Sequence, residues 1–336
     1  MSEHPSRSVL PIAVDAMGGD KAPDEIVAGA RQAADELGVP VVLVGSPERL
    51  GDTGGLEVLP ASEVIGMEDD PAQGVRRKKD SSLVRAAEAV RDGRASAMVS
   101  AGNTGATMAS ALLRMGRLKG VQRPAIATPI PVPGTLPTLL LDAGANTECT
   151  AQHLVQFAQM GSVFFAERYG VTAPRVGLLS IGEEASKGTP LVKETHQLLV
   201  AGAGVTFVGN VEGRDLMTDA VDVVVTDGFT GNVALKTLEG ALRFFMAVVA
   251  SRLPGDALTP LLPVASELDP DATGGAMLLG VDGVCIISHG SSGVRAVVSA
   301  VRVAAEMVEA GLVDRLRGAV GGASSSQAHN RRAPVH

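Results

Sequence analysis

Five short segments of the sequence combine glycines with hydroxyl, amide or charged side chains, and this combination suits the binding of an anion. They are "DAMGGD" at 15–20, "AGNTGA" at 101–106, "DAGANTE" at 142–148, "GEEASKGTP" at 182–190 and "HGSSG" at 289–293. Each follows an apolar run and precedes a helical pattern. Helix N-termini present free N–H groups and a partial positive charge, so these loops suit phosphate. One such loop would be a weak signal, but five indicate an anionic ligand.

The first of these segments leaves two interpretations open. Gly18 and Gly19 allow a positive φ or a close approach of the backbone to a ligand. Asp15 and Asp20 could hold a cation or a lysine, or could orient the amides of the loop. The alternative is a tight strand–helix turn in which Asp20 lies near the N-cap.

Several well-defined catalytic motifs are missing from the sequence. Lys187-Gly188-Thr189 has the reverse order of a Walker A loop, and no strand is followed by G-x-G-x-x-G. Neither an H-E-x-x-H nor a G-x-S-x-G motif occurs. The sequence therefore argues against a P-loop NTPase, an ordinary NAD-binding domain, a zinc hydrolase and a serine hydrolase.

The elements that must position these loops alternate along the chain. Short apolar runs predict strands at 10–14, 39–45, 95–100, 138–143, 175–181, 205–209, 221–226 and 283–288. Several are apolar throughout, which is typical of parallel strands covered on both faces. Helical patterns lie between them, such as the stripe of valines within 291–308. The alternation predicts a doubly wound α/β fold with a mainly parallel sheet.

The domain organisation follows from the same reading. We expect a single α/β/α domain over 8–316 and a disordered polar tail over 317–336. The segment 121–137 contains five prolines, and it is expected to cross between subregions or to form edge strands.

Composition narrows the partners. The net charge is −8, aromatic residues are few, and no long basic run occurs, so nucleic acid is an unfavourable partner. Cys149 and Cys285 are the only cysteines, which indicates neither disulfides nor a zinc site. The start "MSEHPSRS" has no apolar region of a signal peptide, and we expect a cytoplasmic protein. The basic "RRKKDSS" at 76–82 is either a solvated turn or a patch that steers an acidic partner.

Taken together, the motifs resemble those of the acyl-acyl-carrier-protein:phosphate acyltransferases, the PlsX family. The resemblance runs from Ile12 to about Val303 and is carried by an ordered series of long motifs. They include "VDAMGGD", "RRKKDSS", "VSAGNTGA", "LDAGAN", "PRVGLLSIGEEASKG", "GNVEGRD", "DVVVTDGFTGNVALKT" and "HGSS".

This resemblance implies transfer of a fatty acyl group from acyl carrier protein to inorganic phosphate, for phospholipid synthesis, without metal or cofactor. It implies a Rossmann-like α/β/α sandwich similar to phosphotransacetylases and isocitrate dehydrogenase-like proteins. It also implies a homodimer, peripheral membrane association and a membrane glycerol-3-phosphate acyltransferase as a partner.

The residues expected to act follow from the matched motifs and the chemistry of the reaction. The catalytic candidates are Asn103, Lys187, His289 and Asp15, the last of which we expect to work through a bridging cation. Candidates for phosphate or acyl binding are Gly18, Gly19, Asp20, Thr104, Gly105, Asn146, Gly188, Asn210, Arg214, Asn232, Gly290, Ser291 and Ser292. Arg77, Lys78 and Lys79 are expected to meet the acidic carrier protein. Cys149 is expected to take no part in covalent catalysis.

A helical hairpin is predicted over about 233–268. Its first helix carries a one-sided apolar stripe but becomes apolar nearly all round in its second half, unlike a surface helix. The hairpin could form a dimer interface, or its tip with Leu258, Leu261 and Leu262 could enter the membrane surface. The resemblance favours both.

Two rival functions remain. A decarboxylating dehydrogenase on a related fold would need paired metal-binding aspartates on a helix and a nucleotide site, and the sequence shows neither. A non-enzymatic scaffold for a carrier protein or a membrane would give the anion-binding loops no functional role.

Overall fold

The computed structural model describes residues 10–253, 258–268 and 273–329, and it divides the chain into two compact units. Unit 1 consists of Met1–Gly116 and Val281–Glu309, and unit 2 consists of Arg117–Gly280 and Ala310–His336. We describe each unit by itself, because each has its own strands and its own covering helices. The single domain expected over 8–316 stays a prediction. Each unit is α/β, as the sequence predicted.

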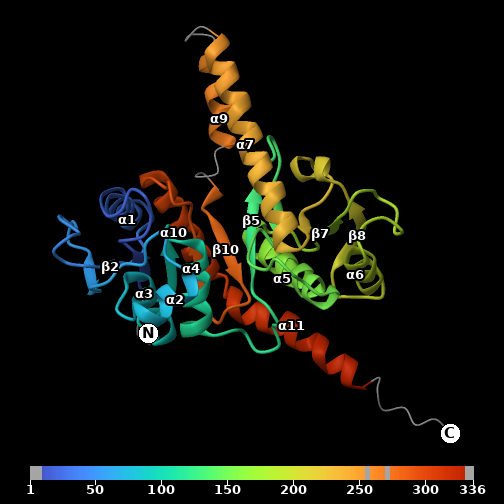
Figure 1. Ribbon diagram of the computed structural model, residues 1–336, viewed down its shortest axis with the longest axis horizontal. Helices are drawn as coiled ribbons and strands as arrows, with labels where there is room; N and C mark the ends of the chain where they lie inside the picture. Colours follow the sequence, from blue (N-terminus) through green and yellow to red (C-terminus); the bar gives the residue numbers. More distant parts are fainter. Residues whose placement is uncertain (1–9, 254–257, 269–272, 330–336) are drawn as a thin grey trace, which may run out of the picture. The chain divides into compact units, whose positions relative to one another are not determined.

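Unit 1 is built on five parallel strands in the order β3-β2-β1-β4-β11. The strands are β1 (Ile12–Asp15), β2 (Val41–Gly45), β3 (Glu57–Pro60), β4 (Ala97–Ser100) and β11 (Val284–Ile287). The helical segments are α1 (Asp24–Leu37), α2 (Pro71–Arg77), α3 (Ser82–Arg91), α4 (Thr104–Ser110), η1 (Ala111–Met115) and α10 (Val294–Glu309). Figure 1 shows these segments in blue to teal and in the orange-red of the last strand and helix.

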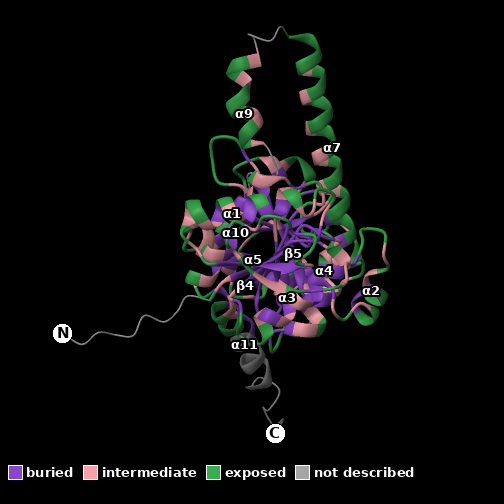
Figure 2. Ribbon diagram, turned by 90° about the vertical axis from the view of Figure 1, so that its left-hand side faces the viewer, coloured by how far each residue is buried: buried purple, intermediate pink, exposed green. Residues whose placement is uncertain are grey.

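The four apolar strands of unit 1 lie between two layers of helices. Helices α1 and α10 pack on each other, and α3 packs on β1, β2 and β4 from the other side (Figure 2). The valine stripe of α10 is buried at Val297, Val298 and Val301, as its spacing predicted. The contact with α1 is close, because a Cβ at Gly29 would lie 2.6 Å from Cβ of Val297. This packing fixes the helix that follows the "HGSSG" loop.

Unit 2 has a mixed sheet in the order β10-β5-β6-β9-β7-β8. Its strands are β5 (Ala125–Ile130), β6 (Thr138–Leu141), β7 (Arg175–Leu179), β8 (Thr206–Val211), β9 (Val223–Val225) and β10 (Ala276–Leu279). Its helical segments are α5 (Ala151–Tyr169), α6 (Pro190–Val200), η2 (Gly213–Met217), α7 (Gly228–Arg252), η3 (Thr259–Leu261), α9 (Leu262–Glu267) and α11 (Leu312–His329). Strand β5 is antiparallel to β10 and β6, and the remaining pairs are parallel.

The core of unit 2 is centred on α5, which packs on β6, β7 and β9. Phe157, Phe164 and Phe165 are fully buried there, so three of the seven phenylalanines fill one core. A Cβ at Gly161 would lie 2.9 Å from Cγ1 of Val223, so this glycine allows the helix to approach the sheet closely.

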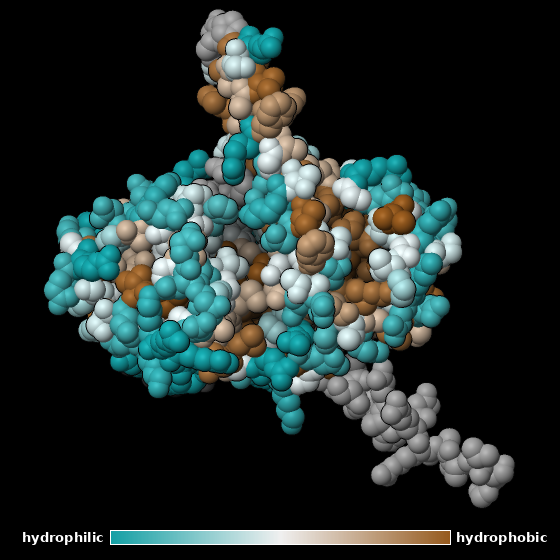
Figure 3. Space-filling view, viewed as in Figure 1, coloured by the Kyte–Doolittle hydropathy of each residue, from teal (hydrophilic) through white to brown (hydrophobic). Residues whose placement is uncertain are grey.

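The hairpin predicted over 233–268 is present, with α7 as its first arm and η3 and α9 in the returning arm. Among the residues of α7 only Gly228 and Gly231, at its start, are buried. Phe244, Phe245 and Val248 are exposed on the far half of the helix. Figure 3 shows apolar atoms on the surface of this hairpin. A helix that exposes these side chains has an apolar surface that the chain itself does not cover.

A helix covers the first part of the segment 317–336 that was predicted to be a disordered tail, and residues 330–336 lie outside the described residues. Helix α11 runs to His329, and Leu312, Leu316 and Val320 are buried along one of its faces. Helix α11 packs against α5, and Arg315 forms an ion pair of 3.0 Å with Glu167 of that helix. The apolar residues at intervals of four therefore extend the folded part beyond 316.

Candidate active site

In unit 1 the structure brings together three of the predicted loops at one edge of the sheet. Strand β1 pairs with β4, and β4 pairs with β11, all in parallel, so their carboxyl ends lie side by side. The backbone N–H of Asp20 donates to the carbonyl of Gly290 at 2.8 Å, which joins the first loop to the third. A Cβ at Gly19, whose φ is +107°, would lie 3.1 Å from the carbonyl oxygen of Ala101. These contacts explain why the first loop needs glycine.

Asp15 stands behind this edge and is only 1% exposed. Its Oδ2 accepts a hydrogen bond from Oγ of Ser100 at 2.7 Å, and its Oδ1 accepts one from the N–H of Met17 at 3.3 Å. Burial raises the pKa of Asp15, while hydrogen bonds from serine hydroxyls and loop amides oppose that shift. A Cβ at Gly18 would lie 2.5 Å from Oδ2. Asp15 therefore orients the loop amides, which was one of the roles that the sequence left open for it. The bridging cation expected at Asp15 stays a prediction.

Ser100 extends this arrangement to the second loop. Asp15 and Ser100 are paired residues of β1 and β4. The hydroxyl that donates to Asp15 also accepts the N–H of Gly102 at 3.0 Å. One buried serine thus fixes the loops that begin at residues 16 and 101 relative to each other.

Asn103 has a structural role in the described geometry. Its Oδ1 accepts from the N–H of Ala106 at 3.0 Å and caps α4. Its Nδ2 donates to the carbonyls of Met67 at 2.8 Å and Asp69 at 3.2 Å. Both amide hydrogens are therefore engaged within the protein, and the side chain ties α4 to the segment before α2. Thr104 and Gly105 form the first turn of α4, and their role in phosphate binding stays a prediction.

The "HGSSG" loop and Ser288 before it carry hydrogen-bond donors at this edge of unit 1. Nδ1 of His289 accepts the N–H of Ser291 at 3.3 Å and lies 2.8 Å from its Oγ. In the neutral ring Nδ1 is therefore the acceptor, and Nε2 carries the hydrogen. Nearby, the buried hydroxyls of Ser288 and Ser292 have no hydrogen-bond partner among the residues that the structure describes. Met67 lies against Gly290, since a Cβ there would be 2.9 Å from Cε of Met67.

The first turn of α10 is partly occupied by a carboxylate. The N–H of Val294 donates to Oε2 of Glu25 at 3.1 Å. Asp20 is exposed beside Gly290, and α1 begins only at Asp24, so Asp20 does not cap that helix.

In unit 2 a buried carboxylate organises the "DAGAN" loop. Asp142 is fully buried and accepts the N–H groups of Ile126, Gly144, Ala145 and Asn146 at 2.8–3.1 Å. Nδ2 of Asn146 donates to the same carboxylate and to the carbonyl of Pro124, both at 2.8 Å. Burial raises the pKa of Asp142, and the amide donors oppose the shift. The side chain of Asn146 is therefore held by hydrogen bonds within the protein.

Asn232 lies on α7 next to this loop. Its Nδ2 donates to the carbonyl of Ala143 at 3.2 Å, and the residue is exposed. Asp227 caps α7 by accepting the N–H of Thr230 at 2.9 Å. The structure therefore brings the predicted residues Asn146 and Asn232 together in one place.

The loop with Lys187 lies between β7 and α6. The N–H of Lys187 donates to the carbonyl of Glu184 at 2.9 Å, and the side chain is exposed. Gly188 follows with φ +93°. Nδ2 of Asn210 donates to the same carbonyl at 2.9 Å, so Asn210 supports this loop from behind. Arg214 is exposed and forms ion pairs with Glu183 and Glu212, at 3.5 and 3.3 Å.

The three cations expected to meet a carrier protein differ in their surroundings. Arg77 and Lys79 are exposed. Lys78 is half-buried, and its Nζ binds Oδ2 of Asp69 at 2.5 Å and the carbonyl of Val64 at 2.8 Å. Lys78 therefore holds the same segment that Asn103 holds, and the free charge of this turn comes from its neighbours.

Three further findings concern membranes, metals and cavities. At the hairpin, Leu262 is 62% exposed, while Leu258 and Leu261 are half-buried.

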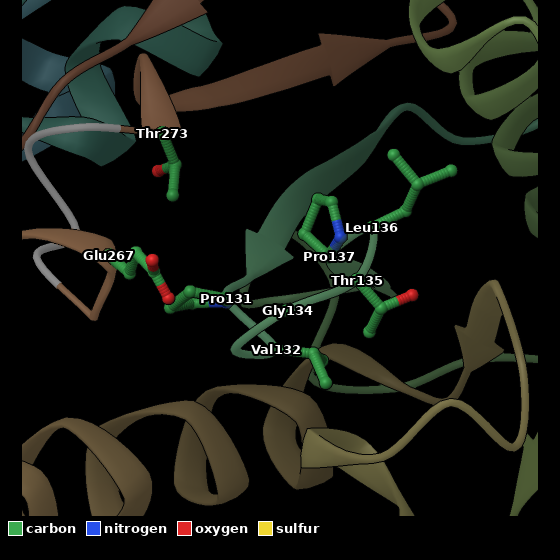
Figure 4. A pocket seen from close by; sticks show the side chains of 8 residues that line it. All are labelled: Pro131, Val132, Gly134, Thr135, Leu136, Pro137, Glu267 and Thr273. Atoms are coloured by element: carbon green, nitrogen blue, oxygen red, sulfur yellow. The ribbon is translucent and has the colours of Figure 1, made fainter. Parts of the chain in front are cut away.

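Within the described ranges no helix has the length and apolar character needed to cross a bilayer. In the same ranges no three His, Cys, Asp or Glu side chains form a cluster suited to a metal ion. An open hollow of about 630 Å³ in unit 2 is lined by the 131–137 loop, Glu267 and Thr273 (Figure 4), and contains none of the predicted site residues.

Sequence reasoning missed the residues that hold the loops. Ser100, Asp142 and His196 each hydrogen-bond to a predicted loop or to its support. Ser100 and Asp15 are the last residues of apolar strands, and Asp142 directly follows one. This position at a strand end was the sequence signal that could have identified Ser100 and Asp142. Nothing in the local sequence distinguishes His196 from an exposed helical residue.

Comparison with known proteins gives consistent matches. A family described as "Fatty acid synthesis protein" matches residues 10–315. The chain is 49% identical to a phosphate acyltransferase of Elusimicrobium minutum, over 91% of this chain and 94% of the relative. It is 48% identical to a phosphate acyltransferase of Pelotomaculum thermopropionicum, over 93% and 95%.

Solved structures show the same fold at low identity. A phosphotransacetylase from Streptococcus pyogenes matches with a TM-score of 0.63 and 16% identity, over 90% of this chain and 95% of that one. A branched-chain phosphotransacylase from Enterococcus faecalis matches with a TM-score of 0.61 and 17% identity, over 89% and 99%. These likenesses confirm the Rossmann-like α/β class predicted from the sequence.

Proposed function

The chain belongs to the phosphate acyltransferase family, and from this premise we propose that it transfers a fatty acyl group from acyl carrier protein to inorganic phosphate. The products are an acyl phosphate for phospholipid synthesis and the free thiol of the carrier protein. As a member of this family, the chain is an acyltransferase.

The observation that carries the proposal is the set of donors in the "HGSSG" loop. Nε2–H of His289 and the unpartnered hydroxyls of Ser288 and Ser292 lie at the carboxyl edge of the unit 1 strands. Buried hydroxyls without partners carry a desolvation cost, which an oxygen-rich ligand that reaches them would offset. Ligands of open parallel sheets bind at this edge. These groups suit phosphate or the oxyanion that forms from a thioester.

The chemistry needs positioning and charge more than acid–base catalysis. A phosphate oxygen attacks the thioester carbonyl carbon, a tetrahedral oxyanion forms, and the carbon–sulfur bond breaks. The leaving thiolate then takes a proton from solvent. Preorganised donors stabilise the oxyanion, and holding phosphate near the carbonyl removes much of the entropic barrier. We assign the oxyanion or phosphate contact in unit 1 to His289.

In unit 2 we assign the positive charge to Lys187. Its exposed side chain follows a backbone turn that is fixed at Glu184. Asn232 adds an exposed amide beside the "DAGAN" loop. Both residues lie at the carboxyl ends of neighbouring parallel strands, after β7 and β9. Arg214 is a weaker candidate, because two carboxylates already neutralise its charge.

Exposed charged and apolar side chains support the proposed partners of the chain. Arg77 and Lys79 offer exposed positive charge for an acidic carrier protein. The apolar far half of α7 supports a homodimer, and the exposed Leu262 supports contact of the hairpin with the membrane surface. A lipophilic acyl phosphate would be released there to a membrane glycerol-3-phosphate acyltransferase.

The test is turnover of the purified chain with palmitoyl carrier protein. With phosphate, acyl phosphate should form, trapped as hydroxamate by hydroxylamine, in equal amount to the free thiol. Without phosphate neither should form beyond the spontaneous rate. Thiol release that does not depend on phosphate would contradict the proposal, as would thermal stabilisation by NADP with Mg²⁺ but not by phosphate, which a dehydrogenase predicts. No turnover under any condition would favour the scaffold.

A further inference from the structure

A hydrogen-bonded chain runs from helix α6 to the loop that carries Lys187. Nδ1 of His196 lies 3.0 Å from Oδ1 of Asn210, and Nδ2 of Asn210 donates to the carbonyl of Glu184 at 2.9 Å. The same carbonyl accepts the N–H of Lys187 at 2.9 Å. We propose that His196 is a positioning residue, which acts through Asn210 and the Glu184 carbonyl on Lys187. This inference rests on the proposed role of Lys187 in binding phosphate.

The directions of the bonds follow from the chemistry of the groups. A carbonyl only accepts, so the amide nitrogen of Asn210 faces Glu184 and its oxygen faces the histidine. The oxygen also only accepts, so Nδ1 of His196 carries the hydrogen. Asn210 is 6% exposed, so its amide has little access to water as an alternative partner. A change at His196 therefore leaves a buried acceptor unpaired.

The ring of His196 is also held from the side. The ring of Phe207 meets it edge-on, with centroids 5.2 Å apart and an interplanar angle of 77°. His196 lies on α6, which begins directly after the Lys187 loop, at Pro190. The position of the His196 ring is thus fixed by Phe207 of β8 and by helix α6, which directly follows the Lys187 loop.

The side chain of Lys187 lies along Gly182, since a Cβ there would be 2.9 Å from Cγ of Lys187. It is exposed, and within the described residues it has no ion pair. The backbone from which this flexible side chain extends is held by the turn from Glu184 to Lys187 and by Gly188 after it. When the Glu184 carbonyl loses the oriented amide of Asn210, the turn gains freedom, and the ammonium group occupies its binding position less often.

Two substitutions separate the donor from the bulk of the ring. His196→Asn keeps an N–H at about the position of Nδ1, whereas His196→Leu keeps a similar volume without a donor. We expect His196→Leu to raise the KM for phosphate about fivefold to tenfold, the equivalent of one hydrogen bond, and to leave the KM for acyl carrier protein within about twofold. His196→Asn should stay within about twofold of the wild type for both. A wild-type phosphate KM in His196→Leu, or an equal rise of both KM values, would overturn the inference.

A double-mutant cycle with Lys187→Ala tests the route of the effect. If His196 acts through Lys187, His196→Leu should add nothing to the phosphate KM in the Lys187→Ala background. A full additional effect there would show a general structural role and contradict the inference.

A substitute variant and a binding measurement distinguish a failure of this inference from a failure of the proposed function. If His196→Leu does not fold, His196→Gln replaces it, because its donor lies one methylene farther out and should fail where His196→Asn succeeds. If the wild type forms no acyl phosphate, the proposed function fails. The same variants are then compared by calorimetric titration with inorganic phosphate, and equal affinities would refute the role of His196 independently.

Discussion

Replacing Ser100 by alanine should lower the free energy of unfolding far more than the loss of one surface hydroxyl. The hydroxyl donates to Oδ2 of Asp15 at 2.7 Å and accepts the N–H of Gly102 at 3.0 Å, and both serine and aspartate are about 1% exposed. A hydrogen bond to a charged group contributes about 1.5–3 kcal/mol, and an unsatisfied buried N–H costs about 1–3 kcal/mol. The two terms overlap, and we expect a loss of about 3 kcal/mol.

The assay is urea unfolding followed by far-UV circular dichroism, because the chain has no Trp and one Tyr. The midpoint should fall while the slope m stays constant. The control is Ser46→Ala, whose hydroxyl binds the exposed carboxylate of Glu48 and whose loss should cost less than about 0.5 kcal/mol. A loss below 1 kcal/mol for Ser100→Ala, equal to the control, would refute the reasoning.

The pH dependence of the same variant has a definite sign. Burial raises the folded-state pKa of Asp15 above its unfolded value. The folded protein therefore holds this proton more tightly than the unfolded chain, and the buried carboxylate costs stability once it is ionised. The donor from Ser100 offsets part of that cost, so the loss in Ser100→Ala should be largest above the folded pKa of Asp15. It should shrink as the pH falls through that value, whereas a constant or growing loss would contradict the assignment.

Three other predictions concern the thiol, the basic turn and the hairpin. Burial and then the nearby carboxylates raise the pKa of Cys149 to about 11, so the thiolate fraction at pH 8 is about one in a thousand. Cys149→Ala should keep most activity, and an acyl adduct seen by mass spectrometry in the wild type but not in this variant would exclude direct attack by phosphate. Lys79→Glu should raise the KM for acyl carrier protein and weaken its salt dependence without loss of stability. Lys78→Glu should also destabilise the protein by up to about 1 kcal/mol, because it breaks the ion pair with Asp69. An equal loss of activity with acyl-CoA as the acyl donor would place these lysines in the catalytic step. Leu261→Glu combined with Leu262→Glu should abolish binding to phosphatidylglycerol vesicles and leave the dimer and solution activity nearly intact, and a monomeric or unfolded variant would assign this segment to the core instead.

The sequence predicted the central parallel strands because burial on both faces leaves a continuous apolar run. It missed β3, which is largely exposed, and β10. It also misplaced β5, which lies between β10 and β6, although an edge strand was one expectation for its proline-rich segment. The register explains the proline. Strand β10 pairs with Ala125–Ala127 only, so Pro129 lies where β5 is paired with β6 alone. The missing N–H therefore breaks no bond to β10.

The location of the candidate site could be predicted better than the roles of its residues. The "HGSSG", "DAGAN" and Lys187 loops do lie at the ends of strands, as their composition indicated. Asn103 and Arg214 looked like ligand-binding side chains, but Asn103 holds α4 and its neighbouring segment, and Arg214 is paired with two glutamates. Which partner a polar side chain chooses depends on residues distant in the sequence, and local spacing carries no record of them.

The division of unit 1 between two chain segments has a consequence for protein synthesis. Residues up to Gly116 leave the ribosome before Val281–Glu309 exist, with the whole of Arg117–Gly280 in between. At about 5–20 residues per second, this interval lasts roughly 10–30 s. Throughout it, the edge of β4 lacks β11, and the face of α1 that packs on α10 lacks its cover. A nascent chain therefore presents an unpaired strand edge for seconds. Unit 2 can form most of its sheet before the last segment of unit 1 has been synthesised.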